Sequence, residues 1–318
     1  MKKSYHLNER SHHLLSVIER KAADLGVEKV QLPKGATGYD FGINASGSLE
    51  AGKWLALVCM SDLASISWTD VQVGDHTCAS VKVRTDQPVI ACMASQYAGM
   101  QVSVDKYFAI GSGPMRALCA EEELFEKIGY SEQSEVAVGI LETGKTPTQE
   151  VVEVLSNKLK VFPFNLHLLF APTASIAGGF QVVARSVETS LHKLVELGYD
   201  INKVIYGEGS APLPPVARDD LEAMGRTNDG ILYGGQVKLH VTGDDQSIER
   251  IGKQTPSSAS EDYGEPFVDI FKRYNQDFYQ IDKLLFSPAQ ITFRNTTTNN
   301  EFHFGQTAPE VLERSFSS

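Results

Sequence analysis

Residues 166–197 read LHLLFAPTASIAGGFQVVARSVETSLHKLVEL, and this stretch contains one complete pattern of strand, loop and helix. The apolar run at 166–170 predicts a buried strand, and small residues fill the junction at 171–179. Apolar residues at helical spacing then continue over 182–197. A strand therefore leads directly into a helix, which is typical of layered α/β proteins.

The same alternation recurs on both sides of this stretch. Strand-like segments are predicted at 38–43, 65–73, 79–83, 102–110, 136–141, 204–206 and 236–241. Helical patterns are predicted at 16–25, 114–128 and 149–158, and Gly26 is expected to end the first of them. The sequence as a whole therefore predicts an α/β fold.

The length of 318 residues favours about two domains. The regular pattern is interrupted near residues 85–88 and again between 244 and 261. We therefore expect residues 1–86 and 245–318 to pair as one discontinuous α/β domain. Residues 87–244 would form a second α/β domain that carries the helix at 182–197.

Composition argues against several classes of function. The net charge of −11 and the pI near 5.2 argue against a nucleic-acid partner. The start of the chain is polar and no run of about 18 apolar residues follows, so we expect no membrane partner and a cytoplasmic location. The four cysteines have no C-x-x-C spacing, which favours reduced, buried thiols over a metal or redox site.

Three junctions rich in small residues follow predicted strands, at 110–116, 171–179 and 207–212. Small side chains let a ligand approach the backbone, and Pro114 can open a helix whose free N–H groups attract an anion. Arg116 could add a guanidinium fork for phosphate or carboxylate. Tight turns without any ligand explain each junction equally well.

The sharpest candidate site lies on the helix expected over 181–195. At about 100° per residue, Arg185, Glu188 and His192 fall together beside the apolar stripe. Burial there would raise the pKa of Glu188, whereas the guanidinium one turn earlier would lower it. The carboxylate could then act as a general base at neutral pH. On spacing alone, an ordinary solvated ion pair worth under ~1 kcal/mol is the more common arrangement.

A polar segment at 217–230 supplies further candidates. Arg226, Asn228 and Asp229 could hydrogen-bond the amide and guanidine-like edges of a heterocycle. A solvated Asn-Asp-Gly bend, followed by a strand-like run, explains the same residues. Neither G-x-S-x-G nor H-E-x-x-H is present, which argues against a serine triad and a zinc site of that type.

Several motifs resemble those of the methenyltetrahydromethanopterin cyclohydrolases of methane-producing archaea and methylotrophic bacteria. They lie at 45–52, 107–114, 171–175, 184–189, 222–229, 231–235 and 260–264, and together they span most of the chain. The resemblance implies two α/β domains enclosing a cleft, a homotrimer, and an enzyme with no metal or bound organic cofactor. It also implies that Arg185 and Glu188 are catalytic, which reverses the expectation from spacing alone.

The implied reaction is the reversible hydrolysis of 5,10-methenyltetrahydromethanopterin to the 5-formyl compound in one-carbon metabolism. The resemblance fits either direction of this reaction, and both methanogenesis and formaldehyde oxidation. Two alternatives remain open: a folate-type methenyl cyclohydrolase, and a non-catalytic binder of a phosphorylated pterin-like ligand. The residues expected to bind the pterin substrate are Ser112, Gly113, Arg116, Thr173, Ser175, Arg226, Asn228 and Asp229.

Overall fold

The computed structural model describes residues 4–277 and 280–317. The chain divides into two compact units, the first formed by Met1–Ala64 with Ile90–Gln181 and the second by Ser65–Val89 with Val182–Ser318. Each unit contains a six-stranded mixed sheet with helices beside it. The expected two-domain α/β fold is therefore confirmed.

The chain passes between the units near residues 64, 89 and 181 rather than at 86 and 244. Strands β3 (Ser65–Val73) and β4 (His76–Thr85) form a hairpin, and β4 pairs antiparallel with β9 (Val204–Pro212). This pairing assigns residues 65–89 to the second unit. Pairing between segments so far apart in sequence leaves no mark on local composition. The N-terminal and C-terminal segments consequently belong to different units, and not to one discontinuous domain.

The sheet of the first unit has the strand order β1-β2-β8-β7-β6-β5. Strands β2, β8 and β7 run parallel, so their carboxyl ends lie along one edge, and the other pairs are antiparallel. The expected strand at 102–110 is a hairpin that turns at Asp105, whose φ is 50°. The strands are β1 (Glu28–Gln31), β2 (Thr37–Asp40), β5 (Met100–Val104), β6 (Tyr107–Ser112), β7 (Ala137–Glu142) and β8 (Leu166–Ala171).

Apolar side chains of this sheet alternate between two cores. Ile140 and Leu169 pack with Leu15 of α1 and Leu55 of α3, whereas the neighbouring side chains of β7 and β8 pack with α6. Burial on both faces explains why these strands read as continuous apolar runs. The helices are α1 (Leu7–Arg20), α2 (Ala22–Leu25), α3 (Leu49–Cys59), α4 (Arg116–Cys119), α5 (Glu123–Ile128), α6 (Gln149–Leu159) and α7 (Ile176–Val183).

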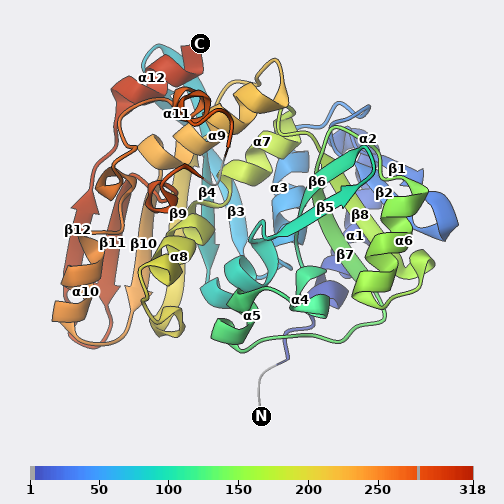
Figure 1. The fold of residues 1–318 in the computed structure, drawn as a ribbon, viewed down its shortest axis with the longest axis horizontal. Coiled ribbons are helices and arrows are strands. Elements are labelled where there is room, and N and C mark those ends of the chain that lie inside the picture. The colour runs from blue at the N-terminus through green and yellow to red at the C-terminus, as the bar shows by residue number, and fades with distance from the viewer. Residues whose placement is uncertain (1–3, 278–279, 318) are drawn as a thin grey trace. The chain divides into compact units, whose positions relative to one another are not determined.

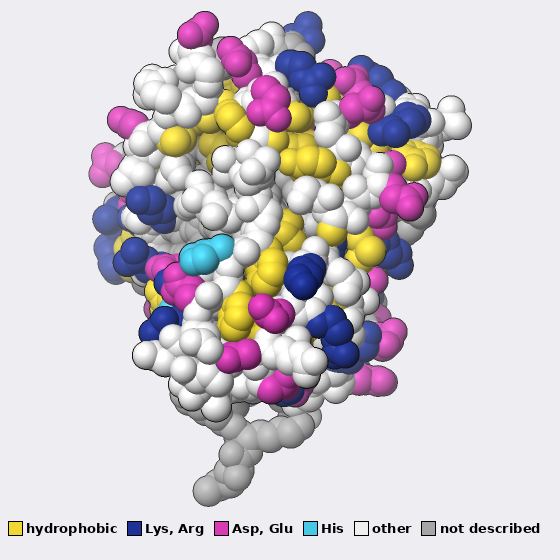
Figure 2. Space-filling model, turned by 90° about the vertical axis from the view of Figure 1, so that its left-hand side faces the viewer, with side chains coloured by type: hydrophobic (Ala, Val, Ile, Leu, Met, Phe, Trp, Pro, Cys, Tyr) yellow, Lys and Arg dark blue, Asp and Glu magenta, His cyan; other side chains and the backbone are white. Residues whose placement is uncertain are grey.

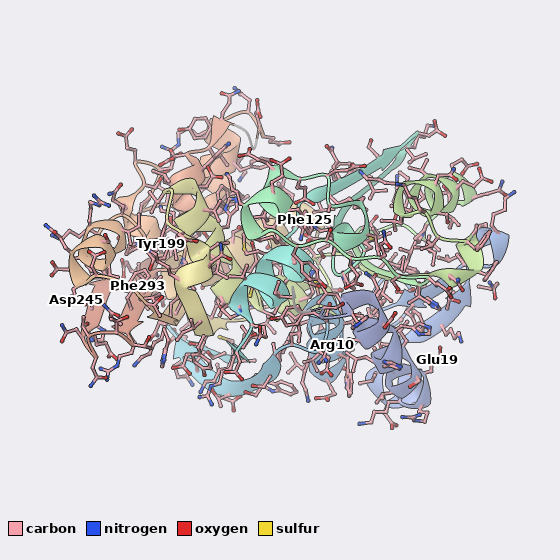
Figure 3. The ribbon with its side chains drawn as sticks, turned by 90° about the horizontal axis from the view of Figure 1, so that it is seen from below. Arg10, Glu19, Phe125, Tyr199, Asp245 and Phe293 are labelled. Atoms are coloured by element: carbon pink, nitrogen blue, oxygen red, sulfur yellow. The ribbon has the colours of Figure 1, made fainter. Side chains whose placement is uncertain are left out.

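Two features at the ends of α1 and α2 are clear. Gly26, at φ 67°, ends α2 in the left-handed conformation as expected. Glu19, near the end of α1, accepts hydrogen bonds from Lys29 Nζ at 2.9 Å and Tyr39 OH at 2.7 Å (Figure 3). The described chain also contains shorter helical segments. They are the π-helix η2 (Val89–Gln96) and the 3₁₀ turns η1 (Pro33–Gly35), η3 (Pro163–Asn165), η4 (Ile201–Lys203), η5 (Ser257–Ala259) and η7 (Lys283–Leu285).

The sheet of the second unit has the order β12-β11-β10-β9-β4-β3. Strands β10 (Gln236–Val241) and β11 (Gln290–Asn295) pair in parallel, and β12 (Glu301–Gly305) and the other strands pair antiparallel. The strands predicted at 65–73 and 236–241 match β3 and β10 at both ends. The predicted strand at 204–206 is longer, because β9 continues to Pro212.

Helices α8 (Ser186–Glu196) and α10 (Asp245–Gly252) cross the strands of this sheet, α8 over β9 and β10 and α10 over β11 and β12 (Figure 1). Asp245 fastens α10 by accepting hydrogen bonds from Asn295, Thr298 and Asn300 (Figure 3). In the same unit, a buried apolar cluster packs together three helices, α9 (Asp220–Gly234), α11 (Phe267–Arg273) and α12 (Pro309–Ser317).

Charged side chains of both signs are interspersed on the face shown in Figure 2, with hydrophobic side chains in small groups between them. The net charge of −11 is therefore not gathered into one acidic patch on that face. In the described part of the chain, the helices are too short or too polar to cross a membrane.

Candidate active site

Arg185 and Glu188 lie at the start of α8. Helix α7 ends at Val183 and α8 begins at Ser186, so the single helix expected over 181–195 is two helices separated by a turn. Thr189 stabilises this turn, because its backbone N–H and its hydroxyl both donate to the carbonyl oxygen of Arg185 at 2.8 Å. The break places Glu188 in the first turn of a helix.

The two residues are nearly buried. Arg185 and Glu188 are each 6% exposed, so Glu188 does not point into bulk solvent. Burial disfavours a bare carboxylate, whereas the free N–H groups of the first turn of a helix stabilise one. The predicted apolar stripe beside them is present, since Val187, Leu191 and Leu194 are fully buried. A nearly buried acid therefore follows a nearly buried arginine by three residues at the start of α8.

Glycines of β9 allow the start of α8 to lie close to the sheet. A Cβ atom at Gly209 would lie 2.5 Å from Ser186 Oγ, and one at Gly207 would lie 2.8 Å from Val187 Cγ1. Residues 207–212 belong to β9 and are not the strand-to-helix junction that was expected. The glycines at 207 and 209 are explained by the close packing of α8, which holds Ser186 and Val187, the residues between Arg185 and Glu188, against the sheet.

Further along α8, two side chains are held by burial. Desolvation lowers the pKa of His192, and its Nε2 lies 3.8 Å from Glu196 Oε1. Lys193, which the sequence did not single out, is fully buried and donates to the carbonyl oxygen of Leu284. Burial lowers the pKa of Lys193 to about 8. These contacts anchor the helix and do not extend the pair at its start.

Arg116, in the first unit, is not available as an anion fork. Its guanidinium is fully buried, donates to Glu122 at 2.9 Å and to Met93 O at 3.0 Å, and lies over the rings of Tyr97 and Phe125. The helix that it begins has only four residues. The expectation that Arg116 binds the substrate is therefore wrong, because protein groups surround the charge.

Ser112 and Gly113 form a tight turn beside it. Ser112 is 2% exposed and its Oγ lies 3.4 Å from Cys59 Sγ. Gly113 has φ 87°, and a Cβ atom there would lie 2.5 Å from Ile140 Cδ1. The backbone itself therefore requires glycine at this position. The substrate-binding role expected for Ser112 and Gly113 stays a prediction.

Thr173 and Ser175 follow β8 at the carboxyl edge of the parallel strands. The Thr173 hydroxyl hydrogen-bonds the carboxylate of Glu142, at the end of β7. The Ser175 hydroxyl donates to Pro172 O at 2.8 Å and accepts from Gly178 N at 3.0 Å, which caps α7. This edge therefore holds Thr173 and Ser175, which were predicted as substrate ligands, together with Glu142, which was not predicted.

Two acidic residues at this edge were not among the site residues predicted from the sequence. Glu142 ends β7, and Asp40 ends β2. The Asp40 carboxylate accepts hydrogen bonds from the backbone N–H groups of Gly42, Ile43 and Asn44 at 2.7–2.9 Å. The position of each acid at the end of a strand-like segment was the available signal, because parallel strands end at a common edge.

Arg226, Asn228 and Asp229 all lie in α9, which continues through the expected Asn-Asp-Gly bend and ends at Gly234, where a strand-like run was expected. Arg226 pairs with Glu222, and Asn228 Nδ2 donates to Met224 O at 2.8 Å. These partners lie on the same helix, so they do not by themselves prevent contact with a ligand.

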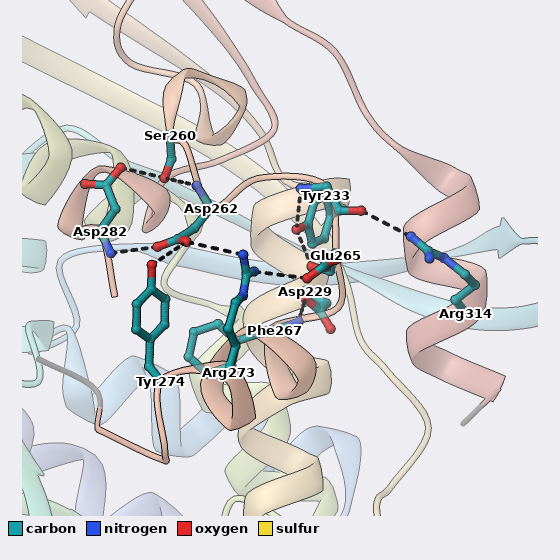
Figure 4. Close-up of polar contacts among 11 residues, drawn as sticks. Asp229, Tyr233, Ser260, Asp262, Glu265, Phe267, Arg273, Tyr274, Asp282 and Arg314 are labelled. Carbon is teal, nitrogen blue, oxygen red and sulfur yellow. Dashed lines mark hydrogen bonds and ion pairs between the residues drawn. The ribbon is translucent and has the colours of Figure 1, made fainter. Parts of the chain in front are cut away.

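Asp229 is completely buried, and both of its carboxylate oxygens are used within the protein. Figure 4 shows the contact between Asp229 and Phe267. Oδ1 accepts from Phe267 N at 2.8 Å, and Oδ2 accepts from Ser315 Oγ at 2.6 Å. The expectation that Asp229 contacts the substrate is therefore wrong. Its carboxylate joins α9 to α11 and α12.

Comparison with known proteins gives a consistent result over nearly the whole chain. The sequence model of the family described as "Cyclohydrolase (MCH)" matches residues 6–316. Proteins named methenyltetrahydromethanopterin cyclohydrolase are 44% identical in Methylobacillus flagellatus, over 93% of this chain and 90% of that protein, and 41% identical in Methanococcoides burtonii, over 98% of each. One from Rhodopirellula baltica is 44% identical over 89% of this chain and 86% of its own length.

Proposed function

We propose, because this chain belongs to the cyclohydrolase (MCH) family, that it reversibly hydrolyses 5,10-methenyltetrahydromethanopterin to 5-formyltetrahydromethanopterin. The reaction opens a carbon–nitrogen bond of a cyclic amidine in one-carbon metabolism. The observation that carries the mechanism is the nearly buried pair of Arg185 and Glu188 at the start of α8. We assign Glu188 as the general base and Arg185 as the group that orients it.

The substrate determines what the base must do. Its N5=CH–N10 bridge is a delocalised cation, so the bridge carbon is open to attack by water. Glu188 accepts a proton from the attacking water as the new carbon–oxygen bond forms, which gives a neutral carbinolamine. Transfer of that proton to N10 allows the bond between N10 and the bridge carbon to break. The hydroxyl proton is then lost, leaving the N5-formyl product and one released proton.

The surroundings of Glu188 favour this chemistry. A carboxylate with little exposure attracts the cationic bridge more strongly than one in water would. The guanidinium of Arg185 and the N–H groups at the start of α8 favour the ionised form of the acid. The mechanism therefore uses one acid, one orienting cation and one water molecule.

The test is the loss of the methenyl absorbance on hydrolysis. Glu188→Gln keeps the size of the side chain but cannot accept the proton, so we expect kcat to fall by at least about 100-fold with a modest change in KM. Glu196→Gln, on the same helix but more exposed, is the matched control and should keep wild-type turnover. Near wild-type turnover in Glu188→Gln would mean that the base is another group.

The alternatives predict different outcomes of the same assay. A folate-type enzyme would turn over methenyltetrahydrofolate at least as well as the methanopterin compound. A non-catalytic binder would bind the pterin without any loss of absorbance. The names of the relatives favour neither alternative.

We also propose a homotrimer that acts in the cytoplasm. Membership of the family supports the trimer, and the free state of the four cysteines fits a reducing compartment. Light scattering on the purified protein should then give three times the chain mass of 34.8 kDa. A mass equal to one chain would contradict the trimer.

A further inference from the structure

An exposed pair of phenylalanines lies in the first unit, outside the candidate active site. Phe162 and Phe164 are 67% and 60% exposed. Their ring centroids are 5.3 Å apart and their planes differ by 6°, so the rings are stacked in parallel. Adjacent large aromatic side chains left in water are a mark of a binding surface and not of internal packing.

The backbone holds this aromatic pair in place. Helix α6 ends at Leu159 and is capped by Lys160 in the left-handed conformation, and Val161 N donates to Ser156 O at 3.1 Å. Phe162 then precedes η3, in which Asn165 N donates to Phe162 O at 2.9 Å. Because the rings stand on a short connection between a helix and a strand, a ligand would lose little free energy in ordering them.

The pair forms one wall of a cavity of about 730 Å³. That volume lies in the range of small-molecule sites, roughly 300–1,000 Å³. Apart from Val161 and Pro163, the rest of the lining is polar and includes Glu135, Asn157 and Lys160. It offers an acceptor, a carboxamide and a donor, so the cavity suits a flat ring whose edge both donates and accepts hydrogen bonds. Ser156, also in the lining, has a buried hydroxyl with no hydrogen-bond partner in the described part of the chain.

The charges of the lining favour an uncharged ligand. Glu153, a further lining residue, is already paired with Lys34 at 3.1 Å. The remaining charges of Glu135 and Lys160 are opposite in sign and balance each other. A ligand with a net charge of either sign would therefore gain attraction from one group and repulsion from the other.

The cavity is separate from the carboxyl edge of the same sheet. The phenylalanines precede β8, which begins at Leu166, whereas Thr173 follows its end at Ala171. A six-residue strand spans roughly 20 Å. The aromatic pair and the Thr173 loop thus lie at opposite ends of one strand.

We propose that this cavity is a second small-molecule site, which binds an uncharged planar heteroaromatic ring by stacking on the aromatic pair. The polar lining binds the edge of the ring through hydrogen bonds. This inference does not depend on the proposed hydrolase activity.

The experiment is a titration of the full chain with adenine as the probe. Adenine binding is measured by isothermal titration calorimetry and by saturation-transfer NMR of the ligand. We expect Phe162→Ala and Phe164→Ala each to weaken adenine binding by at least tenfold. Phe108→Ala is the matched control, because it removes a ring that is 51% exposed elsewhere in the same unit, and it should leave binding unchanged. Benzene, which has no hydrogen-bonding group at its edge, should bind at least tenfold more weakly than adenine.

Several results would overturn the proposal. Equal adenine affinity in the wild type and both alanine variants would place the ligand elsewhere, and no binding at millimolar adenine would remove the site. A change in the molar mass of the assembly in the Phe162→Ala variant would show that the pair is a contact between copies. Turnover of the methenyl substrate should be unaffected in both variants. A loss of turnover in either variant would show that the cavity belongs to the active site. The adenine titration does not depend on the hydrolase assay, so it tests this site even if the wild type shows no hydrolase activity.

Discussion

The carboxylate of Asp229 and the hydroxyl of Ser315 form a buried hydrogen bond of 2.6 Å between residues 86 positions apart in sequence. The other carboxylate oxygen receives the N–H of Phe267, the first residue of α11. Helices α9, α11 and α12 are thereby joined through one acid. Tyr233, one turn further along α9, adds a hydrogen bond to Glu265 O in the loop before α11.

Asp229 should make stability depend on pH. Burial raises the pKa of Asp229 from 3.8 to about 7 in the folded chain. Between these values the folded state holds a proton that the unfolded state has released, so this group's stabilisation is full below about pH 3.8 and is lost as the pH rises to about 7. The slope for one proton is at most about 1.4 kcal/mol per pH unit.

Asp229→Asn isolates this effect, because Asn can accept from Phe267 N and donate to Ser315 Oγ without titrating. Urea unfolding of both proteins at pH 5 and pH 8 gives the comparison. Relative to the variant, the wild type should be less stable at pH 8 than at pH 5. A constant difference between the two proteins would show that Asp229 does not titrate in this range.

Removal of the hydroxyl at Ser315 should destabilise the chain. Ser315→Ala leaves one oxygen of Asp229 without this donor in a buried position, which costs on the order of 1–3 kcal/mol. Ser317→Ala, at an exposed position of the same helix, is the control and should change the unfolding free energy by less than about 0.5 kcal/mol. Equal effects of the two substitutions on the urea midpoint would argue against the buried hydrogen bond.

Gly209 should be needed for turnover although it carries no functional group. In Gly209→Ala the new methyl group meets Ser186 Oγ at 2.5 Å, so the start of α8 must move away from β9 and carry Glu188 with it. We expect kcat to fall at least tenfold, since a misplacement of about 1 Å can cost about 100-fold in rate. Adding Ser186→Ala removes the clashing oxygen and should restore part of kcat. No restoration in the double variant would rule out this contact as the cause.

Arg116 should matter for stability and not for substrate affinity. Arg116→Met removes the buried guanidinium and leaves the Glu122 carboxylate, which is 24% exposed, without its partner, which costs on the order of 1–3 kcal/mol. The KM of the methenyl substrate should stay within about twofold of the wild type, because the guanidinium is surrounded by protein. Denaturant midpoints and initial rates measure the two effects. A large rise in KM with unchanged stability would restore Arg116 as a substrate ligand.

Regular elements could be predicted where the local pattern was strong. Helix α6 follows the predicted 149–158 closely, because Thr148 caps a clear amphipathic repeat. Helix α9 was missed, because Gly225, Gly230 and Gly234 indicate turns in an isolated segment. In the structure a Cβ atom at Gly230 or Gly234 would lie 2.6 Å from Pro212, so these glycines permit close packing against the end of β9.

The sequence by itself determined the alternation of strands and helices and the three-residue spacing of Arg185 and Glu188 beside an apolar stripe, because both depend on the local period of the backbone. It did not predict the break that leaves Arg185 in the turn before α8. Only the tertiary structure decided that β4 joins β9, that Arg116 and Asp229 are used inside the protein, and that Glu188 is nearly buried. Each of these rests on contacts between distant segments, and the pattern of neighbouring residues contains no record of which distant group will be the partner.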